Sequence, residues 1–570
     1  MLELTDKNIT GKVLDHLGIV SATIDNIGLI SKVDARLPLS LNKGVKTTIG
    51  QRVSAMILNG LGFINTRLYM FPEFLENKPV GRLIGKNLVA EDFNDDALGR
   101  ALDSIHEYGT NKLFTEIAFE IGVEQGLLGK SIHVDSTSLS VHGEYKEEAE
   151  VVTNPEVITE DSELIATPQI TYGHSKDHRP DLKQVILNLA TTGAAGFPIM
   201  METHSGNASD QKILHEAVCR MKKFCKKLNG LPEFMYVGDS AMYNSCVNND
   251  EDFIWLSRVP ESINEAKALL QKEDKSFAWQ DLGNGYRICP IDSRYKDVKQ
   301  RWCVVSSEQA YTREIITLGK NIIKENERAN QVLKNISRQQ FACKKDAVEA
   351  LNMLTKKIKY HKFVAHLVEV RKHPKNGRPK KGVLGSVMGY KLQGVVEEDT
   401  IKIAIAKLTK GRFILATNQL DIKLLPTETI LSEYKEQSKT ESGFKFIKDN
   451  SFEVSSIFLK KAERISALMM IMTLCLMVYC IAQHTLRTSL QTLNKDVLNQ
   501  NGSPTQKPTM KSVFKLFHGV QVLTIIINGE VQELVINLNV QLKDILHFFG
   551  SKALEIYDLT EQTLVIQNGN

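Results

Sequence analysis

Apolar residues recur at helical spacing through the first 125 residues of the chain. One apolar residue every three or four positions runs through KVLDHLGIVSATIDNIGLI (12–30) and QRVSAMILNGLGFINTRLYMFPEFL (51–75). Asn94 or Asp95 is placed to cap a further helix through ALGRALDSIHEYG. Short helices joined by Gly and Pro turns suit a helix-turn-helix-like DNA-binding unit, and they suit a plain helical packing domain as well. We therefore predict a helical N-terminal domain over residues 1–125.

The period changes to two near residue 131. The segment SIHVDSTSLSVHGEY (131–145) alternates like a pair of strands that turns near Gly143. Two more strands are predicted in KQVILNLATT (183–192) and FPIMMETH (197–204), followed by an amphipathic helix over 209–228 and a strand in EFMYVGD. Three strands, a helix and a strand follow the order expected of an RNase H-like α/β sheet.

A long segment then interrupts this order. Its first part holds Trp255, Trp279 and Trp302 in strand-like sequence, and its middle is charged and helical. The predicted fold class is α/β, with an RNase H-like core, a large mainly β insertion, a helical N-terminal domain and a small C-terminal unit. The predicted domains after the first are a core in two parts, 126–249 and 411–490, an insertion over 250–410, and a linker with a β-containing unit over 491–570.

The segment from Ile465 to Ala482 is apolar throughout its 18 residues. That length is the lower limit for a transmembrane helix, and a helix buried on all sides of a large core has the same composition. Charged, amphipathic sequence lies on both sides of the segment, so we prefer the buried helix and expect no membrane association.

Composition excludes few classes of protein. The chain has 570 residues with 71 basic and 67 acidic side chains, so its net charge of +4 neither requires nor excludes a nucleic-acid partner. Its eight cysteines form no CxxC pair, which favours reduced, buried thiols in a cytoplasmic protein. The first residues lack the layout of a signal peptide. No Walker-type phosphate loop is present, so no ATP-driven step is indicated.

Two aspartates belong to predicted strands, one inside its strand and one at the end. Asp135 interrupts the apolar strand HVDSTS, and a carboxylate there binds either an ion or nearby hydroxyl donors such as Ser136. Asp239 ends the strand EFMYVGD, where side chains of α/β sheets point into the ligand-binding crevice. The alternative for Asp239 is an ordinary helix or turn cap.

A third carboxylate, Glu441, belongs to a polar stripe on a predicted helix. At 100° per residue, five polar positions of this segment lie on one face of the helix. These are Tyr434, Gln437, Glu441, Lys445 and Lys448. Such a stripe is able to hold a metal ion at Glu441 while its neighbours bind phosphate. The alternative is a solvated face with an ion pair between Glu441 and Lys445.

Two polar segments are candidates for DNA contact. The first, YGHSKDHRPDLK, precedes a strand, and its alternative is a solvated loop; its candidate residues are His174, Lys176, His178 and Arg179. The second, RKHPKNGRPKKG, suits an extended arm on DNA phosphates or a flexible solvated loop. Its cations are Arg371, Lys372, Lys375, Arg378, Lys380 and Lys381.

With these motifs the chain resembles the DDE transposases of bacterial insertion sequences, of the IS-four type. Their motif D-x-[G/A]-x-[Y/F] is matched by Asp239 to Tyr243, and their motif Y-x2-R-x3-E-x6-K by the stripe around Glu441. A strand carrying DST matches Asp135. Gln437 replaces the family's usual Arg, so one phosphate or carboxylate contact of the family is not implied here.

The segments YGHSKDHRPDLKQ, FLKKAERISALMMIMTLCLMVY and MILNGLGFINTRLYMFPEF are similar to the IS-sixteen-thirty-four branch in particular. The resemblance implies that Asp135, Asp239 and Glu441 hold two Mg²⁺ or Mn²⁺ ions and catalyse DNA cleavage and strand transfer. It implies double-stranded DNA partners (terminal inverted repeats and target DNA), a homodimer on DNA, and a cytoplasmic, nucleoid-associated location. It further implies that the N-terminal domain binds the DNA ends.

Three alternatives remain open at this point. They are a DNA-binding protein derived from such an enzyme without catalysis, a nuclease that cuts without joining, and a membrane protein.

Overall fold

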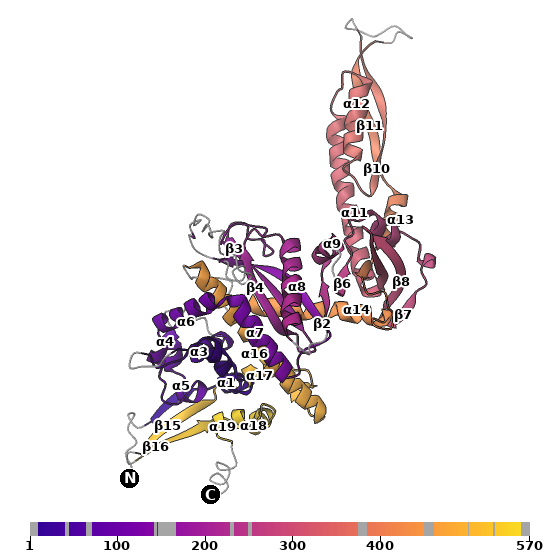
Figure 1. The fold of residues 1–570 in the computed structure, drawn as a ribbon. Helices are drawn as coiled ribbons and strands as arrows, with labels where there is room; N and C mark the ends of the chain where they lie inside the picture. Colours follow the sequence, from indigo (N-terminus) through magenta and orange to yellow (C-terminus); the bar gives the residue numbers. More distant parts are fainter. Residues whose placement is uncertain are drawn as a thin grey trace, which may run out of the picture. The chain divides into compact units, whose positions relative to one another are not determined.

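A computed structural model describes most of the chain, in two compact units (Figure 1). The described residues are 9–39, 45–63, 71–141, 145, 167–228, 233–248, 253–373, 385–449, 461–499, 501–527 and 530–559. The first unit comprises Met1–Trp255 and Glu433–Asn570, and the second comprises Leu256–Ser432. The strand at GRFILATN lies among the residues of the second unit and pairs there with two strands.

Seven helices and a short 3₁₀ turn fill the described residues between 17 and 124. They are α1 (Leu17–Asn26), α2 (Leu29–Arg36), α3 (Ile49–Leu61), α4 (Phe71–Glu76), α5 (Val80–Leu83), η2 (Ala90–Phe93), α6 (Asp95–Tyr108) and α7 (Thr110–Glu124). Asn94 is the cap of α6, since its side chain accepts the N–H of Ala97. These helices pack against one another through their apolar faces, as the helical spacing of the apolar residues predicts.

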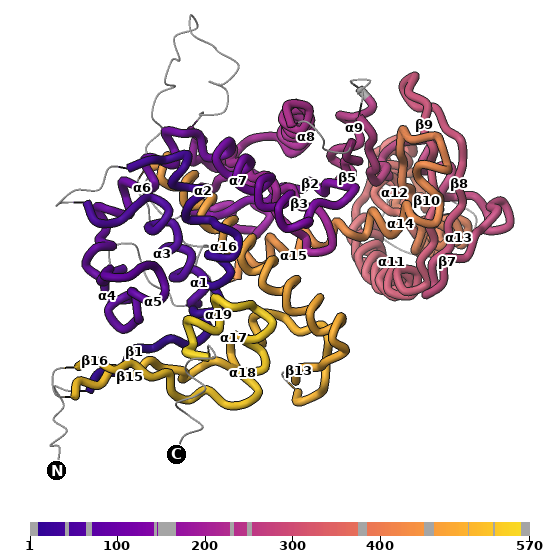
Figure 2. The backbone as a smooth tube through the Cα atoms, turned by 60° about the horizontal axis from the view of Figure 1, so that its bottom comes forward, coloured from indigo at the N-terminus to yellow at the C-terminus, as the bar shows by residue number. Residues whose placement is uncertain are grey.

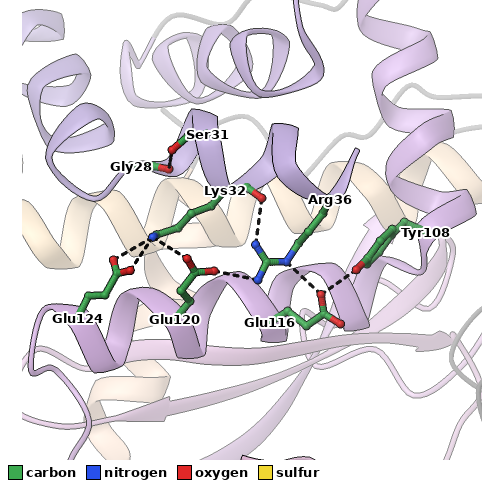
Figure 3. A network of polar contacts seen from close by, with 8 residues as sticks. All are labelled: Gly28, Ser31, Lys32, Arg36, Tyr108, Glu116, Glu120 and Glu124. Carbon is green, nitrogen blue, oxygen red and sulfur yellow. Dashed lines mark hydrogen bonds and ion pairs between the residues drawn. The ribbon is translucent and has the colours of Figure 1, made fainter. Parts of the chain in front are cut away.

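A charged network joins α2 to α7 on the surface of this helical region (Figure 3). Lys32 lies 2.9 Å from both Glu120 and Glu124, and Arg36 binds Glu116 and Glu120 at 3.0 and 2.9 Å. The hydroxyl of Tyr108 donates to Glu116 as well. Because the carboxylates stand at successive turns of α7, the network fixes the register of the two helices.

The sheet of the first unit has the strand order β4-β3-β2-β5. Its strands are β2 (Ser131–Val141), β3 (Lys183–Thr192), β4 (Phe197–Ser205) and β5 (Met235–Gly238). β2 pairs antiparallel with β3 and parallel with β5, and β3 pairs antiparallel with β4. β2 is one strand of 11 residues and not the strand pair we predicted, because its residues are buried on both faces of the sheet. The turn predicted near Gly143 lies outside the described residues.

Helices cover this sheet and continue the unit. α8 (Asp210–Lys227) and α9 (Ser240–Asn248) flank β5 in sequence, and α15 (Gln437–Ile447) packs on β2 and β3. α16 (Ala462–Thr492) contacts β4 and also α1, α3 and α6, and Figures 1 and 2 both draw it beside α1 and α3.

The apolar segment lies in α16. In the described part of the chain α16 is the one helix long and apolar enough to cross a membrane, but 83% of its apolar window is buried against the rest of the unit. This burial fits the core helix that we preferred from the sequence.

The C-terminal residues pack onto the N-terminal helices and do not form the separate unit we predicted. β15 (Gln521–Ile527) lies between β1 (Ile9–Val13) and β16 (Glu530–Ile536) in a three-stranded antiparallel sheet. Figure 2 shows the yellow C-terminal helices beside indigo α1, where the buried Tyr557 donates its hydroxyl to Asp15 O. The remaining elements here are β13 (Val497–Leu498), β14 (Pro504–Thr505), α17 (Met510–Leu516), α18 (Val540–His547) and α19 (Ser551–Ile556). The Asn528-Gly529 turn lies outside the described residues.

The second unit combines an antiparallel sheet with a long helical hairpin and a two-stranded ribbon. Its sheet has the order β6-β12-β9-β8-β7, formed by β6 (Trp255–Arg258), β7 (Gln280–Gly283), β8 (Tyr286–Tyr295), β9 (Val298–Ser307) and β12 (Arg412–Thr417). Figure 1 shows α11 (Glu308–Ser337) and α12 (Lys344–Thr355) running beside the ribbon of β10 (His361–Lys372) and β11 (Ser386–Glu398). The smaller elements are α10 (Asn264–Leu270), η5 (Asp274–Ser276), α13 (Thr400–Leu408) and α14 (Thr427–Lys435).

All eight cysteines are free thiols, which fits the prediction from their spacing. Cys343 is exposed at the start of α12, so the expectation that the thiols are buried is wrong for this residue.

Candidate active site

The register of two parallel strands brings two of the predicted acids together. β2 and β5 pair with Ser131 opposite Met235 and His133 opposite Val237. Continuing this register by two residues places Asp135 level with Asp239. Because adjacent strands lie about 4.8 Å apart, this extension of the register brings the two residues close together where β5 ends.

Asp239 also begins the next helix. One of its carboxylate oxygens accepts the N–H of Ala241 at 2.9 Å, in the first turn of α9. The capping role considered for this residue is therefore present, and it leaves the carboxylate at the end of β5 beside Asp135.

The electrostatic surroundings of Asp135 bring in the third acid. The pKa of Asp135 is raised to about 6. Burial is the largest cause, and the charges of Asp239 and Glu441 also contribute to the rise. The N–H of Ser136, which donates to Asp135 at 2.7 Å, and the ammonium of Lys176 act in the opposite direction. Asp135, Asp239 and Glu441 therefore share one electrostatic site although they are far apart in sequence.

Glu441 is exposed on α15 and makes no hydrogen bond or ion pair with any described residue. The surface ion pair between Glu441 and Lys445, which the sequence left open, is not formed. Lys445 is exposed on the same helix. One face of α15 is buried, through Thr440, Phe444 and Ile447, and Glu441 lies at the edge of this packed face.

Gln437 is buried and does not lie on an exposed polar face. The prediction from helical spacing that Gln437 belongs to the polar stripe is therefore wrong for this residue. Its side chain is only 6% exposed, and its amide nitrogen donates to Val134 O at 3.0 Å. Val134 directly precedes Asp135, and β5 does not extend far enough to pair with this carbonyl. Gln437 thus ties the start of the Glu441 helix to the strand that carries Asp135.

Replacing Gln437 with Leu is expected to destabilise the protein by about 1–3 kcal/mol, because a buried carbonyl loses its donor. We also expect DNA cleavage to fall, since α15 loses one of the contacts that orient Glu441. Denaturant unfolding and a cleavage assay measure the two effects. Ser438→Ala, on the exposed side of the same turn, is the matched control. A Gln437→Leu protein as stable and as active as the parent would contradict this anchoring role.

The polar segment before β3 lies beside the acids. The ammonium of Lys176 donates to Ser136 O at 2.7 Å and lies 3.2 Å from Asp210. Lys448, at the end of α15, binds both oxygens of Asp177 at 2.8 and 3.0 Å. These two contacts join the segment to β2 and to the Glu441 helix, so it forms one wall of the site.

The other predicted DNA contacts in this region differ in their surroundings. His174 and His178 are exposed, and Arg179 is held in an exposed ion pair with Asp181 at 2.7 Å. Tyr434 is half-buried near the end of α14, three residues before the start of α15. Their contact with DNA stays a prediction.

The basic arm lies in the second unit, and only its first two cations are described. Arg371 and Lys372 end β10, where Arg371 pairs with Glu369 and donates to Gly385 O. Arg371 is therefore paired with a carboxylate that lies just before the predicted arm. Lys375, Arg378, Lys380 and Lys381 lie outside the described residues.

Sequence reasoning missed one acid of this neighbourhood. Asp210, the first residue of α8, accepts the hydroxyl of Ser136 at 3.0 Å and pairs with Lys176. It lies one residue after the predicted helix start at Ser209, and a carboxylate in a first helical turn is too common to mark a site from sequence.

The three acids provide the right kind of ligands for a divalent cation but do not form a closed ligand set. Carboxylate oxygens are the hard ligands that Mg²⁺ prefers. The like charges of Asp239 and Glu441 beside the half-buried Asp135 favour a cation between the three acids. Among the residues that the structure describes, no three His, Cys, Asp or Glu side chains lie close enough to hold an ion as they stand. Side-chain rotation, above all of the exposed Glu441, is needed to bring the oxygens together.

Comparison with known proteins gives a family match and a similarity to solved structures. Residues 9–119 match a family described as a domain of unknown function (DUF4277). No curated protein matches the chain. Among solved structures, the chain is similar to one in the cryo-EM structure of the piggyBac transposase synaptic complex with hairpin DNA, with a TM-score of 0.34 and 10% identity over 89% of this chain and 80% of that chain. The chain is thus weakly similar to a transposase, at a level that establishes neither its fold family nor its activity.

Proposed function

We propose that the chain is a DDE transposase of the IS-four type, which cleaves DNA at the ends of an insertion sequence and joins them to target DNA. One observation carries the proposal: Asp135 within β2 and Asp239 at the end of the adjacent strand β5 share an electrostatic site with Glu441 from a facing helix. The same three residues occupy the family's motif positions. Chemistry and motif spacing, which are independent of each other, select the same carboxylates.

The arrangement of the first unit supports an RNase H-like core. Three antiparallel strands, a helix and a parallel strand follow one another as β4-β3-β2 with α8 and β5. Side chains at the carboxyl end of such a parallel strand point into the crevice where ligands bind. Asp239 lies at that end of β5.

Two Mg²⁺ or Mn²⁺ ions held by Asp135, Asp239 and Glu441 would polarise the phosphate, lower the pKa of the attacking water and stabilise the leaving oxygen. The residues of the chain have distinct tasks around this centre. Ser136 N–H holds Asp135 in place, and Lys176 offsets part of the negative charge. Gln437 fixes the helix of Glu441. Lys448 lies at the end of that helix, where its cation would bind a DNA phosphate in exchange for Asp177.

The proposed partners are double-stranded DNA at the terminal inverted repeats and at the target, with two copies of the chain pairing two ends. The N-terminal helices would bind the DNA ends. Such an enzyme acts in the cytoplasm on nucleoid DNA.

A transposition assay tests the proposal. The purified chain is incubated with Mg²⁺, a target plasmid, and a donor plasmid that carries the DNA ends flanking its own reading frame. We expect free 3′-hydroxyl ends and then sequenced joints between element ends and target. Cleavage without joints would identify a nuclease instead, and end binding without cleavage would identify a DNA-binding protein that has lost catalysis.

A further inference from the structure

Four cations surround a groove in the second unit, away from the acids described above. The groove lies between α11 and the turn that leads from α12 into β10, and its volume is about 550 Å³. Lys324 and Arg328 line it from α11, and Lys357 and Lys359 line it from the turn. All four side chains are exposed.

None of these four cations pairs with a carboxylate in the described part of the chain. Among the described residues that line the groove, Glu325 is the one acid, and it is already occupied. Its carboxylate accepts the backbone N–H groups of Lys359 and Tyr360 at 2.9 and 2.8 Å and lies 3.3 Å from His361 Nδ1. The groove therefore has four cations against one carboxylate, which leaves an excess of positive charge.

The pKa of Glu325 is consistent with this role. Burial alone would raise it, but hydrogen bonds from Tyr360, Lys359 and His361 hold it below its ordinary value. Glu325 is thus an ionised anchor that fixes the turn against α11, and it keeps Lys357 and Lys359 facing the cations of the helix.

A second cavity in the same unit contains arginines that are already paired with a carboxylate, and it serves as a comparison. It has a similar volume, about 560 Å³, and contains Arg287 and Arg412. Both arginines pair with Asp274, at 3.0 and 2.9 Å, and both lie over the ring of Trp279. Its arginines stabilise the fold, whereas the cations of the groove have no such task.

The cations on α11 form a row. Lys320, Lys324 and Arg328 follow one another at intervals of four residues, which places them on one helical face about 6 Å apart along the axis. Lys320 is also exposed and unpaired among the described residues. A row of this kind fits a ligand with regularly repeated negative charges better than it fits a single phosphate.

We propose that this groove binds the sugar–phosphate backbone of double-stranded DNA, without reading its sequence, as a second contact outside the active site. The inference rests on the proposed function for the identity of the polyanion. Lysine and arginine side chains in such a row release counterions from DNA, so their contribution grows as salt falls. The groove would hold DNA that extends beyond the cleaved end.

The test is the salt dependence of binding by the full chain to a 40-base-pair duplex that carries the element end. The groove variant replaces Lys324, Arg328, Lys357 and Lys359 with Gln. We expect the slope of log K against log salt to become less steep by about 0.9 per lost contact, or roughly 3–4 in total. The loss should be equal on duplexes of unrelated sequence. A matched control variant carries the same change at four exposed lysines of the same unit, Lys272, Lys275, Lys299 and Lys423.

The outcomes are separable from those of the proposed function. A shallower slope for the groove variant alone, with an unchanged melting temperature, supports the groove. An unchanged slope in a chain that still cleaves and joins element ends overturns the groove and leaves the transposase assignment intact. An equal change in both variants also overturns it, because the effect would then come from net charge. If the parent chain binds RNA or an acidic peptide but not duplex DNA, the groove proposal fails together with its premise.

Discussion

Glu441→Gln is expected to abolish divalent-metal-dependent DNA cleavage, with a loss on the order of 10³-fold or more, while DNA binding is retained. Glu441 is exposed and has no partner among the described residues, so the amide costs little stability. The substitution removes one charged ligand and leaves the shape of α15 unchanged. A strand-cleavage assay with Mg²⁺ and with Mn²⁺ measures the effect, and Ser442→Ala, on the exposed neighbour, is the control.

Asp135→Asn and Asp239→Asn should cause a similar loss of cleavage. Asp135→Asn also has an effect that does not depend on catalysis. Because burial and two neighbouring acids raise the pKa of Asp135 to about 6 from an ordinary value of 3.8, its carboxylate destabilises the metal-free fold at neutral pH relative to the unfolded chain. Removing that charge should raise the melting temperature of the metal-free protein.

The effect of Mg²⁺ on thermal stability tests whether the site binds the ion. Adding Mg²⁺ should raise the melting temperature of the parent chain, since an ion that binds the folded state stabilises it. The same addition should not affect Asp135→Asn. Undiminished cleavage by any of the three acid variants would remove that residue from the ligand set.

Arg220→Met is expected to destabilise the first unit by about 3–5 kcal/mol, because it leaves a buried carboxylate without its main partner. Glu202 on β4 is 1% exposed, and Arg220 on α8 binds its two oxygens at 2.7 Å each. His204 lies 3.2 Å from the same carboxylate. Denaturant unfolding measures the loss.

A double variant is the control for this pair. With Glu202 also replaced by Met, both charges are gone and most of the stability should return, since buried ion pairs and apolar pairs of similar size are often equivalent. A loss below about 1 kcal/mol in Arg220→Met would show that His204 or water compensates the carboxylate, contrary to the expectation.

The pH dependence of stability follows from the same carboxylate. Burial would raise the pKa of Glu202, but hydrogen bonds from His204 and Arg220 lower it to about 2, from an ordinary value of 4.5. Its contribution is therefore fully present above pH 4.5 and is lost as the pH falls from 4.5 toward 2. Unfolding measured over this window should be less pH-dependent in Glu202→Gln than in the parent.

Much of the secondary structure follows from local sequence. The helical period before residue 125, the Asn94 cap and the order of the central strands and helix are all visible in the positions of apolar residues. The apolar α16 was also recognisable as a core helix from the charged sequence on either side of it. These features depend on neighbours within a few turns, so no distant contact is needed to predict them.

Errors arose where a distant partner decides the outcome. Helical spacing put Gln437 on a polar stripe, but an unpaired carbonyl on β2 makes its burial favourable. The C-terminal hairpin was predicted as a separate unit, but β1 from the other end of the chain pairs with it.

The sequence by itself determined which residues are chemically suitable for the site: three acids at the ends of strands and on a helix, with a family spacing. Only the tertiary structure decided that Asp135 and Asp239 stand level on adjacent strands, and that Glu441 is free to approach them. The physical reason is that the strength of a carboxylate as a ligand depends on burial and on neighbouring charges, and both are set by residues distant in the chain. The unpaired cations beside Glu325 became visible for the same reason, since sequence shows charges but not which of them are already neutralised.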